Sequence, residues 1–226
     1  MTSNRMTARI EISIKYRVQM GLILLGMFFV NSNIIAQTKE WDTETTKDGK
    51  VTVNSRISKR TDDKGEEVQL IEYEATTTAS VGIRNCISVV KDVSKHKEFM
   101  DDELSKKVET ISDNEWVIYY YTNSPWPMPD NDTVAKMDFS EDETEGVATF
   151  TVTAAPSMFE MGDVDRMTYY NVTYVFKDLG NGEVEMTVIG KMSPTVQAPA
   201  WMVSSWFPEG PADILRGIVK LALNEN

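Results

Sequence analysis

The chain has 226 residues, enough for one medium-sized domain with a hydrophobic core, and a formal net charge of −12. This acidity argues against nucleic acid as a partner, because phosphates are bound by Lys and Arg, and against lasting attachment to an anionic membrane surface. The only cysteine and the only histidine, Cys86 and His96, are too few for a zinc site or a convincing Cys–His nucleophile pair, so we predict no metal and no catalytic residues.

The first 36 residues follow the order of a secretory signal peptide. Basic residues precede the apolar run "MGLILLGMFFV" (residues 20–30), and a small residue, Ala36, comes after it. The run is about 11 residues long, short of the roughly 20 that span a bilayer. We predict cleavage after Ala36, with an uncleaved interfacial anchor as the alternative. The protein would then be exported, periplasmic or extracellular, with one domain over residues 37–226.

The first third of this domain has the alternating pattern of strands, which then changes to a helical one. In "KVTVNSRIS" (50–58) every second residue from Val51 to Ile57 falls on one side, and "VQLIEYEATTT" (68–78) predicts a further strand. The turn strings "TKDGK" and "TDDKGEE" precede them. From Ser80, the predicted N-cap, apolar residues recur at steps of three and four as far as Val93, which indicates a helix. The string "SKHKEFMDD" predicts one further loose helical turn.

The rest of the chain consists of strands followed by a C-terminal helical segment. Six runs rich in Val, Ile, Thr, Tyr and Phe cover residues 105–112, 115–122, 133–140, 147–155, 167–178 and 183–192, which predicts a curved antiparallel meander. The helical period returns over 198–226, interrupted at "FPEGPA", where Pro208 and Pro211 forbid one unbroken helix. The order predicts an α+β fold, a curved antiparallel sheet around a long C-terminal helix, enclosing a concave apolar space.

The string "NSPWPMPDNDT" (123–133) joins two of the predicted strands with three prolines around Trp126. Prolines stiffen the chain and interrupt a sheet, so the string predicts a rigid corner rather than a plain hairpin turn. We expect Trp126 to pack beneath the sheet or at the edge of the cavity, so that Trp126→Ala costs stability before it costs binding. Asn131 and Asp132 would fix the start of the next strand by side-chain hydrogen bonds to the backbone.

Four segments carry a resemblance to a known family. They are "SVGIRNCISVVKDVSKHKEFM" (80–100), "VIYYYTNSPWPMPDNDTV" (117–134), "DRMTYYNVTYVF" (165–176) and "APAWMVSSWFPEGPADILRGI" (198–218). Over most of residues 41–223 the sequence resembles the START (StAR-related lipid-transfer) family, part of the helix-grip superfamily that includes Bet v 1 and the polyketide cyclases. The chain departs from the family pattern at Asn131, where Arg is frequent, at Tyr174, where many relatives have Trp, and at "MSPTVQAP", which replaces Asp-Pro-Gly-Gly.

The resemblance implies a helix-grip fold that binds a lipid or other hydrophobic small molecule in a tunnel between the sheet and the C-terminal helix. Such a protein would be a carrier or transfer protein, not an enzyme, and would need no cofactor. We expect a monomer that contacts membranes transiently. Two alternatives are an enzyme of the cyclase or hydrolase kind on the same scaffold, and a structural or interaction domain with a filled core. No catalytic constellation is apparent from residue spacing, and fold alone does not fix function.

Candidate ligand-binding residues come from the inward positions of the predicted strands and from the terminal helix. Alternation places the strand candidates on inward faces, where plain core is the alternative for each, while the helix candidates would cover the tunnel. The strand candidates are Met137, Phe139, Phe150 and Met186, and the helix candidates are Met202 and Trp206.

Arg166 matches, by resemblance, an arginine that can point into the cavity of family members. A buried guanidinium needs a partner or a polar ligand head group, so our hypothesis is that Arg166 orients a head group. A salt bridge at the surface beside an acidic loop is the alternative. The possible acidic partners in the sequence are Asp138, Glu160, Asp163 and Asp165.

Overall fold

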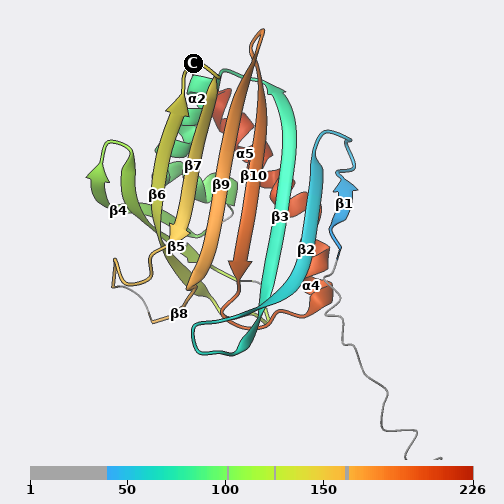
Figure 1. Ribbon diagram of the computed structural model, residues 1–226, viewed down its shortest axis with the longest axis vertical. Coiled ribbons are helices and arrows are strands. Elements are labelled where there is room, and N and C mark those ends of the chain that lie inside the picture. Colours follow the sequence, from blue (N-terminus) through green and yellow to red (C-terminus); the bar gives the residue numbers. More distant parts are fainter. Residues whose placement is uncertain (1–39, 101, 125, 161–162, 226) are drawn as a thin grey trace, which may run out of the picture. The chain divides into compact units, whose positions relative to one another are not determined.

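One large sheet dominates the computed structural model, which describes residues 40–225 except 101, 125 and 161–162 (Figure 1). Within those residues its strands are β1 (Asp42–Thr45), β2 (Thr52–Thr61), β3 (Glu67–Ser80), β4 (Leu104–Ser112), β5 (Glu115–Thr122), β6 (Asn131–Asp142), β7 (Val147–Ala154), β8 (Asp165–Arg166), β9 (Tyr169–Gly180) and β10 (Glu183–Ser193). The predicted signal peptide lies outside the described residues.

The strand order is β1-β2-β3-β10-β9-β7-β6-β5-β4, with β8 paired in parallel to β6. All other pairs are antiparallel, and the six long strands predicted from the second half of the sequence are confirmed as β4 to β7, β9 and β10. The pairing of β3 with β10 joins the first strands to the last, with Ala75 opposite Val188. This long-range pairing joins the first strands to the meander in one open sheet. Four antiparallel pairings separate β10 from β5, so the two strands run in the same direction and the loops after them lie at the same end of the sheet.

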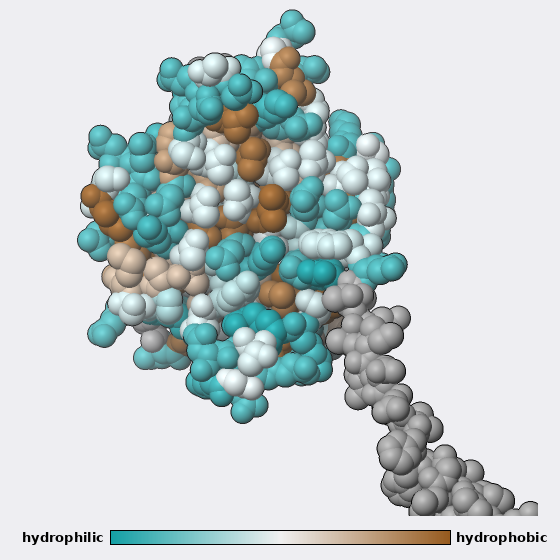
Figure 2. Space-filling model, in the orientation of Figure 1, coloured by the Kyte–Doolittle hydropathy of each residue, from teal (hydrophilic) through white to brown (hydrophobic). Residues whose placement is uncertain are grey.

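The two faces of the sheet differ in polarity because side chains alternate along each strand. On β9 the residues Tyr170, Val172, Tyr174 and Phe176 are buried, while those between them are partly exposed. The opposite face carries many threonines, and one cross-strand pair, Thr76 and Thr187, is joined by a hydrogen bond of 3.1 Å. Figure 2 views the molecule from this side, which is mainly hydrophilic with scattered apolar residues.

The helices lie on the other face of the sheet (Figure 1). They are α2 (Ile83–Lys91), the short 3-10 helix η1 (Val93–Lys95), α3 (His96–Met100), α4 (Ala200–Trp206) and α5 (Glu209–Ala222). The prediction of Ser80 as the N-cap is wrong, because Ser80 ends β3 and Gly82 precedes the first turn of α2. The interruption predicted at residues 207–212 is confirmed between α4 and α5, and Pro211 lies in the first turn of α5. None of the helices that the structure describes is long and apolar enough to cross a membrane.

The core fills the space between α5, α2 and the sheet. Leu215 and Ile218 of α5 are fully buried in one cluster with inward residues of the sheet. Gly217 lets α3 approach α5 closely, since a Cβ there would lie 2.9 Å from the Cα of Phe99. The amide of Asn85 in α2 donates to the carbonyl oxygen of Ala222 at 2.9 Å, which satisfies a backbone acceptor in the last turn of α5.

The corner between β5 and β6 differs from its predicted form. Trp126 is 91% exposed and lines neither the pocket nor the groove described below, so its predicted packing beneath the sheet or at the edge of the cavity is wrong. The expected stability cost of Trp126→Ala therefore loses its basis. Asn131 and Asp132 bond to side chains rather than to the backbone. Asp130 fixes the corner instead, accepting from the Tyr121 hydroxyl at 2.9 Å and from the Ser124 backbone amide at 3.0 Å.

Candidate ligand pocket

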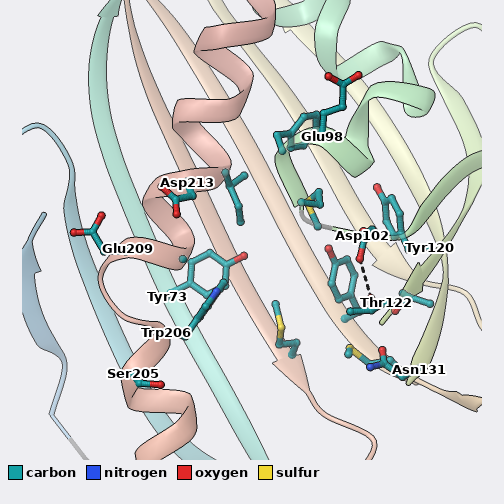
Figure 3. A pocket seen from close by; sticks show the side chains of 18 residues that line it. Tyr73, Glu98, Asp102, Tyr120, Thr122, Asn131, Ser205, Trp206, Glu209 and Asp213 are labelled. Carbon is teal, nitrogen blue, oxygen red and sulfur yellow. Dashed lines mark hydrogen bonds between the residues drawn. The ribbon is translucent and has the colours of Figure 1, made fainter. Parts of the chain in front are cut away.

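A pocket of about 690 Å³ lies between the inner face of the sheet and the helices, where α4 meets α5 (Figure 3). Its lining comes from β3, β5, β6, β9 and β10 on one side and from α3, α4 and α5 on the other. The volume is within the range of pockets that hold small organic ligands, which is about 300–1,000 Å³. The α4–α5 break therefore places a ligand-sized space beside the packed core.

Two aromatic rings form one wall of the pocket, and two glycines make room for them. The rings of Tyr73 and Trp206 meet edge to face, with centroids 5.3 Å apart. Opposite Tyr73 on β10, a Cβ on Gly190 would lie 2.2 Å from the tyrosine ring. A Cβ on Gly210 would lie 1.9 Å from Nε1 of Trp206. Each ring thus lies against bare backbone, a position that only glycine allows.

Tyr120 lines the pocket and is linked to the buried histidine behind it. Nε2 of His96 lies 2.7 Å from the carbonyl oxygen of Val90, which can only accept, so this nitrogen carries the proton. Nδ1 then accepts from the Tyr120 hydroxyl at 2.7 Å. Burial lowers the pKa of His96 to about 4 and raises the pKa of Tyr120 well above its usual value, so both groups are neutral at pH 7.

Polar groups without protein partners also face this space. The Tyr73 side chain is 99% buried, and its hydroxyl points into the pocket in Figure 3 without a hydrogen-bond partner among the described residues. Burial raises its pKa, so the hydroxyl stays protonated. Oδ1 of Asn131, another lining residue, is buried and has no partner in the described chain. Buried polar groups of this kind are commonly satisfied by water or a ligand.

The predicted binding residues fall into two groups in the structure. Trp206 lines the pocket, and Met202 lines an adjoining apolar groove of about 460 Å³ to which Trp206 also contributes. The strand candidates lie elsewhere, in or against the packed core, and line neither space: Met137, Phe139, Phe150 and Met186. The roles of both groups in binding stay predictions.

Arg166 does not line this pocket and has a protein partner. Its Nε and Nη2 donate to the two carboxylate oxygens of Asp132 at 2.8 and 2.7 Å. Its Nη1 donates to the carbonyl oxygens of Pro156, at 2.8 Å, and Phe159. Asp132 is fully buried and was not among the four partners expected from the sequence. Arg166 borders a separate depression of about 360 Å³, and its proposed head-group role stays a prediction.

Sequence reasoning missed most of the lining, including Tyr73, Asp102, Tyr120 and Tyr170. Alternation does mark Tyr73 and Tyr170 as inward-facing, but it marks core residues in the same way, and Tyr120 lies in a continuous run of apolar residues that shows no alternation. Asp102 is a polar residue in a connecting segment, and nothing in its local sequence indicates that it faces a cavity.

The two residues with the most reactive side-chain types are both buried. Cys86 is fully buried in α2, and burial raises the pKa of its thiol to about 11, which leaves little thiolate at pH 7. His96 is fully buried with both ring nitrogens bonded. In the described part of the chain no group of three or more His, Cys, Asp or Glu side chains is placed to hold a metal ion.

A curved antiparallel sheet that holds a C-terminal helix over a pocket defines a helix-grip protein, which confirms the predicted fold class. The structure is similar to a STAR-related lipid transfer protein from Xanthomonas axonopodis, with a TM-score of 0.66, 18% identity, and coverage of 82% of this chain and 99% of that chain. It is also similar to human StAR-related lipid transfer protein 5, with a TM-score of 0.64, 13% identity, and coverage of 97% and 98%.

A human lipid transfer and protein localization domain matches with a TM-score of 0.59, 19% identity, and coverage of 82% and 88%. The predicted resemblance to START domains is therefore confirmed at the level of the fold. No protein-family model and no curated protein matches the sequence.

Proposed function

We propose that this protein binds a lipid or another hydrophobic small molecule in the pocket between the sheet and the α4–α5 junction, and that it acts as a carrier. The observation that carries the proposal is the 690 Å³ space itself, whose lining includes five aromatic and three methionine side chains besides polar ones. The similar structures named for lipid transfer support the same role. Burying about 300 Å² of apolar ligand surface at ~25 cal/mol per Å² gives about 7 kcal/mol before association costs.

Direct analysis of the cargo tests this proposal. Native mass spectrometry and organic extraction of the purified protein should reveal a bound apolar molecule, and the emptied protein should bind the neutral dye Nile red. A protein that carries no apolar molecule and binds no dye would overturn the proposal and favour a domain without a ligand.

Trp206→Ala is expected to weaken dye binding about tenfold, because the lost contact of roughly 60 Å² corresponds to about 1.5 kcal/mol. Trp41→Ala is the matched control, since Trp41 is partly exposed and lines none of the pocket. Fluorescence titration of the two variants against the unmodified protein measures the difference. Equal affinities for both variants would place the dye outside this pocket.

We further propose that the α4 end of the molecule contacts membranes while cargo is exchanged. Trp126 and Trp201 are 91% and 71% exposed. Met128, two residues after Trp126, and Met202, which follows Trp201, both line the apolar groove beside the pocket. Indole rings favour the interface between lipid and water. The groove also shares Trp206 with the pocket, which would give the cargo a short path to the bilayer.

Replacement of both Trp126 and Trp201 by alanine is expected to weaken binding to phosphatidylcholine vesicles at least about tenfold. The protein is acidic, so its attachment should be apolar and change little with salt. Co-sedimentation with vesicles measures both effects, with Trp41→Ala as the control. Vesicle binding that survives the double replacement would refute this contact surface.

A further inference from the structure

Every charged side chain that lines the pocket is acidic. The lining residues in the described chain include Glu98, Asp102, Glu209 and Asp213 but no Lys, Arg or His. The charged part of the described lining is therefore negative. This distribution of charge discriminates between ligands by their charge and not by their hydrophobicity.

The four carboxylates are not equivalent. Glu209 and Asp213 share the guanidinium of Arg216, at 2.7 and 2.8 Å, and Asp48 lies 3.2 Å from the same group. One cation thus faces three acids. In Figure 3 the carboxylates of Glu98 and Glu209 point away from the pocket, whereas Asp102 faces inward beside Thr122, whose hydroxyl donates to it at 2.8 Å. Asp102 is the acid that a bound molecule would approach.

The uncharged groups around Asp102 favour the same kind of ligand. The faces of aromatic rings attract cations, and the lining includes Tyr73, Tyr120, Tyr170 and Trp206. The buried Oδ1 of Asn131, which has no partner in the described chain, can accept from a ligand N–H or O–H. The pocket thus offers acceptors, π faces and negative charge to the polar end of an apolar molecule.

We propose that the pocket selects apolar ligands with an ammonium head group over those with a carboxylate, and that Asp102 is the main determinant of this selectivity. The inference rests on the proposed function, since it concerns the occupant of the same pocket. A carboxylate near Asp102 would be repelled at short range in a partly desolvated space, where charges are screened less than in water. An uncharged alcohol of the same chain length should fall between the two.

The test measures how tightly three compounds bind by their displacement of Nile red at pH 7. The compounds are decyltrimethylammonium, decanol and decanoate, each used below its micelle concentration. The ammonium compound should bind at least about tenfold more tightly than decanoate, a difference that shrinks as salt is added. Asp102→Asn keeps the size of the side chain and an acceptor for Thr122, and should reduce the ratio about fivefold or more while decanol binds unchanged. Glu74→Gln removes the same charge from an exposed position on β3 and should leave the ratio unaltered.

The three compounds separate failure of this inference from failure of the proposed function. If decanol displaces the dye but decanoate binds as well as the ammonium compound, the charge preference is wrong and hydrophobic binding stands. If the dye does not bind and the compounds have no effect, both ideas fail. Should Asp102→Asn not fold, the ratio measured on the unmodified protein still decides the charge preference.

Discussion

Arg166→Ala is expected to lower the free energy of unfolding by about 3–5 kcal/mol, the usual cost of leaving one partner of a buried ion pair alone. Asp132 is fully buried, and Arg166 satisfies both of its carboxylate oxygens. The same guanidinium also bonds the carbonyl oxygens of Pro156 and Phe159, which hold the segment after β7 against the start of β6. Without Arg166 the buried carboxylate would lose its counter-charge and this segment its anchor.

Urea unfolding followed by circular dichroism measures this loss, with Arg84→Ala as the control. Arg84 pairs with Glu141 at 2.7 Å, but its side chain is 64% exposed, so its removal should cost less than about 1 kcal/mol. Arg166→Met combined with Asp132→Leu should recover much of the lost stability, because the penalty belongs to the unpaired charge. Similar small losses for the two arginine variants would contradict the structural role of Arg166.

Local periodicity was enough to predict most of this fold. Alternation in "EVEMTVIGKM" corresponds to β10, because inward and outward positions differ in polarity wherever one face of a strand is buried. The continuous run of β-forming residues in "EWVIYYYT" corresponds to β5, where Trp116 to Tyr120 are all buried and no alternation is seen. The short β1 and β8 have too few residues to show a pattern. Their positions depend on pairing with distant strands, which no local window of sequence contains.

The pocket could not be predicted in the same way, because inward-facing residues line both the packed core and the open space. Met186 and Tyr73 lie on neighbouring strands and both face inward, yet only Tyr73 reaches the pocket. The difference arises from Gly190 and Gly210, which accept the rings of the aromatic wall, and from the break between α4 and α5. These features act through contacts between segments far apart in the chain.

Composition was also a poor guide to the exposure of single residues. Three prolines around Trp126 indicated a rigid corner, but rigidity does not fix the side on which the indole lies. The structure places it in solvent, on the surface for which we proposed membrane contact. Sequence neighbourhood was an equally poor guide to the partner of Arg166. The acidic loop nearby suggested partners, but the residue that forms the bidentate ion pair, Asp132, lies at the start of another strand.

His96 is expected to make the protein less stable as the pH falls from about 6.5 to about 4. The folded state keeps the ring neutral, with a pKa of about 4, whereas the unfolded chain protonates it near the ordinary value of 6.5. Between these values the unfolded state binds more protons, so the free energy of unfolding decreases with falling pH. The contribution of His96 to this decrease is about 3 kcal/mol, is absent above about pH 6.5, and grows no further below about pH 4.

His96→Gln separates this effect from the carboxylates that titrate in the same range. The glutamine amide can still bond in the pocket of Val90 and Tyr120 but does not titrate, so the variant should be less stable at pH 7 and lose less stability on acidification. Asp92 and Glu225, whose pKa values are lowered by hydrogen bonds, remain in both proteins, so the difference between the two curves reports His96. Urea unfolding at intervals between pH 7 and pH 4 measures it. Parallel curves would mean that the buried ring accepts a proton as readily in the folded state as in the unfolded chain.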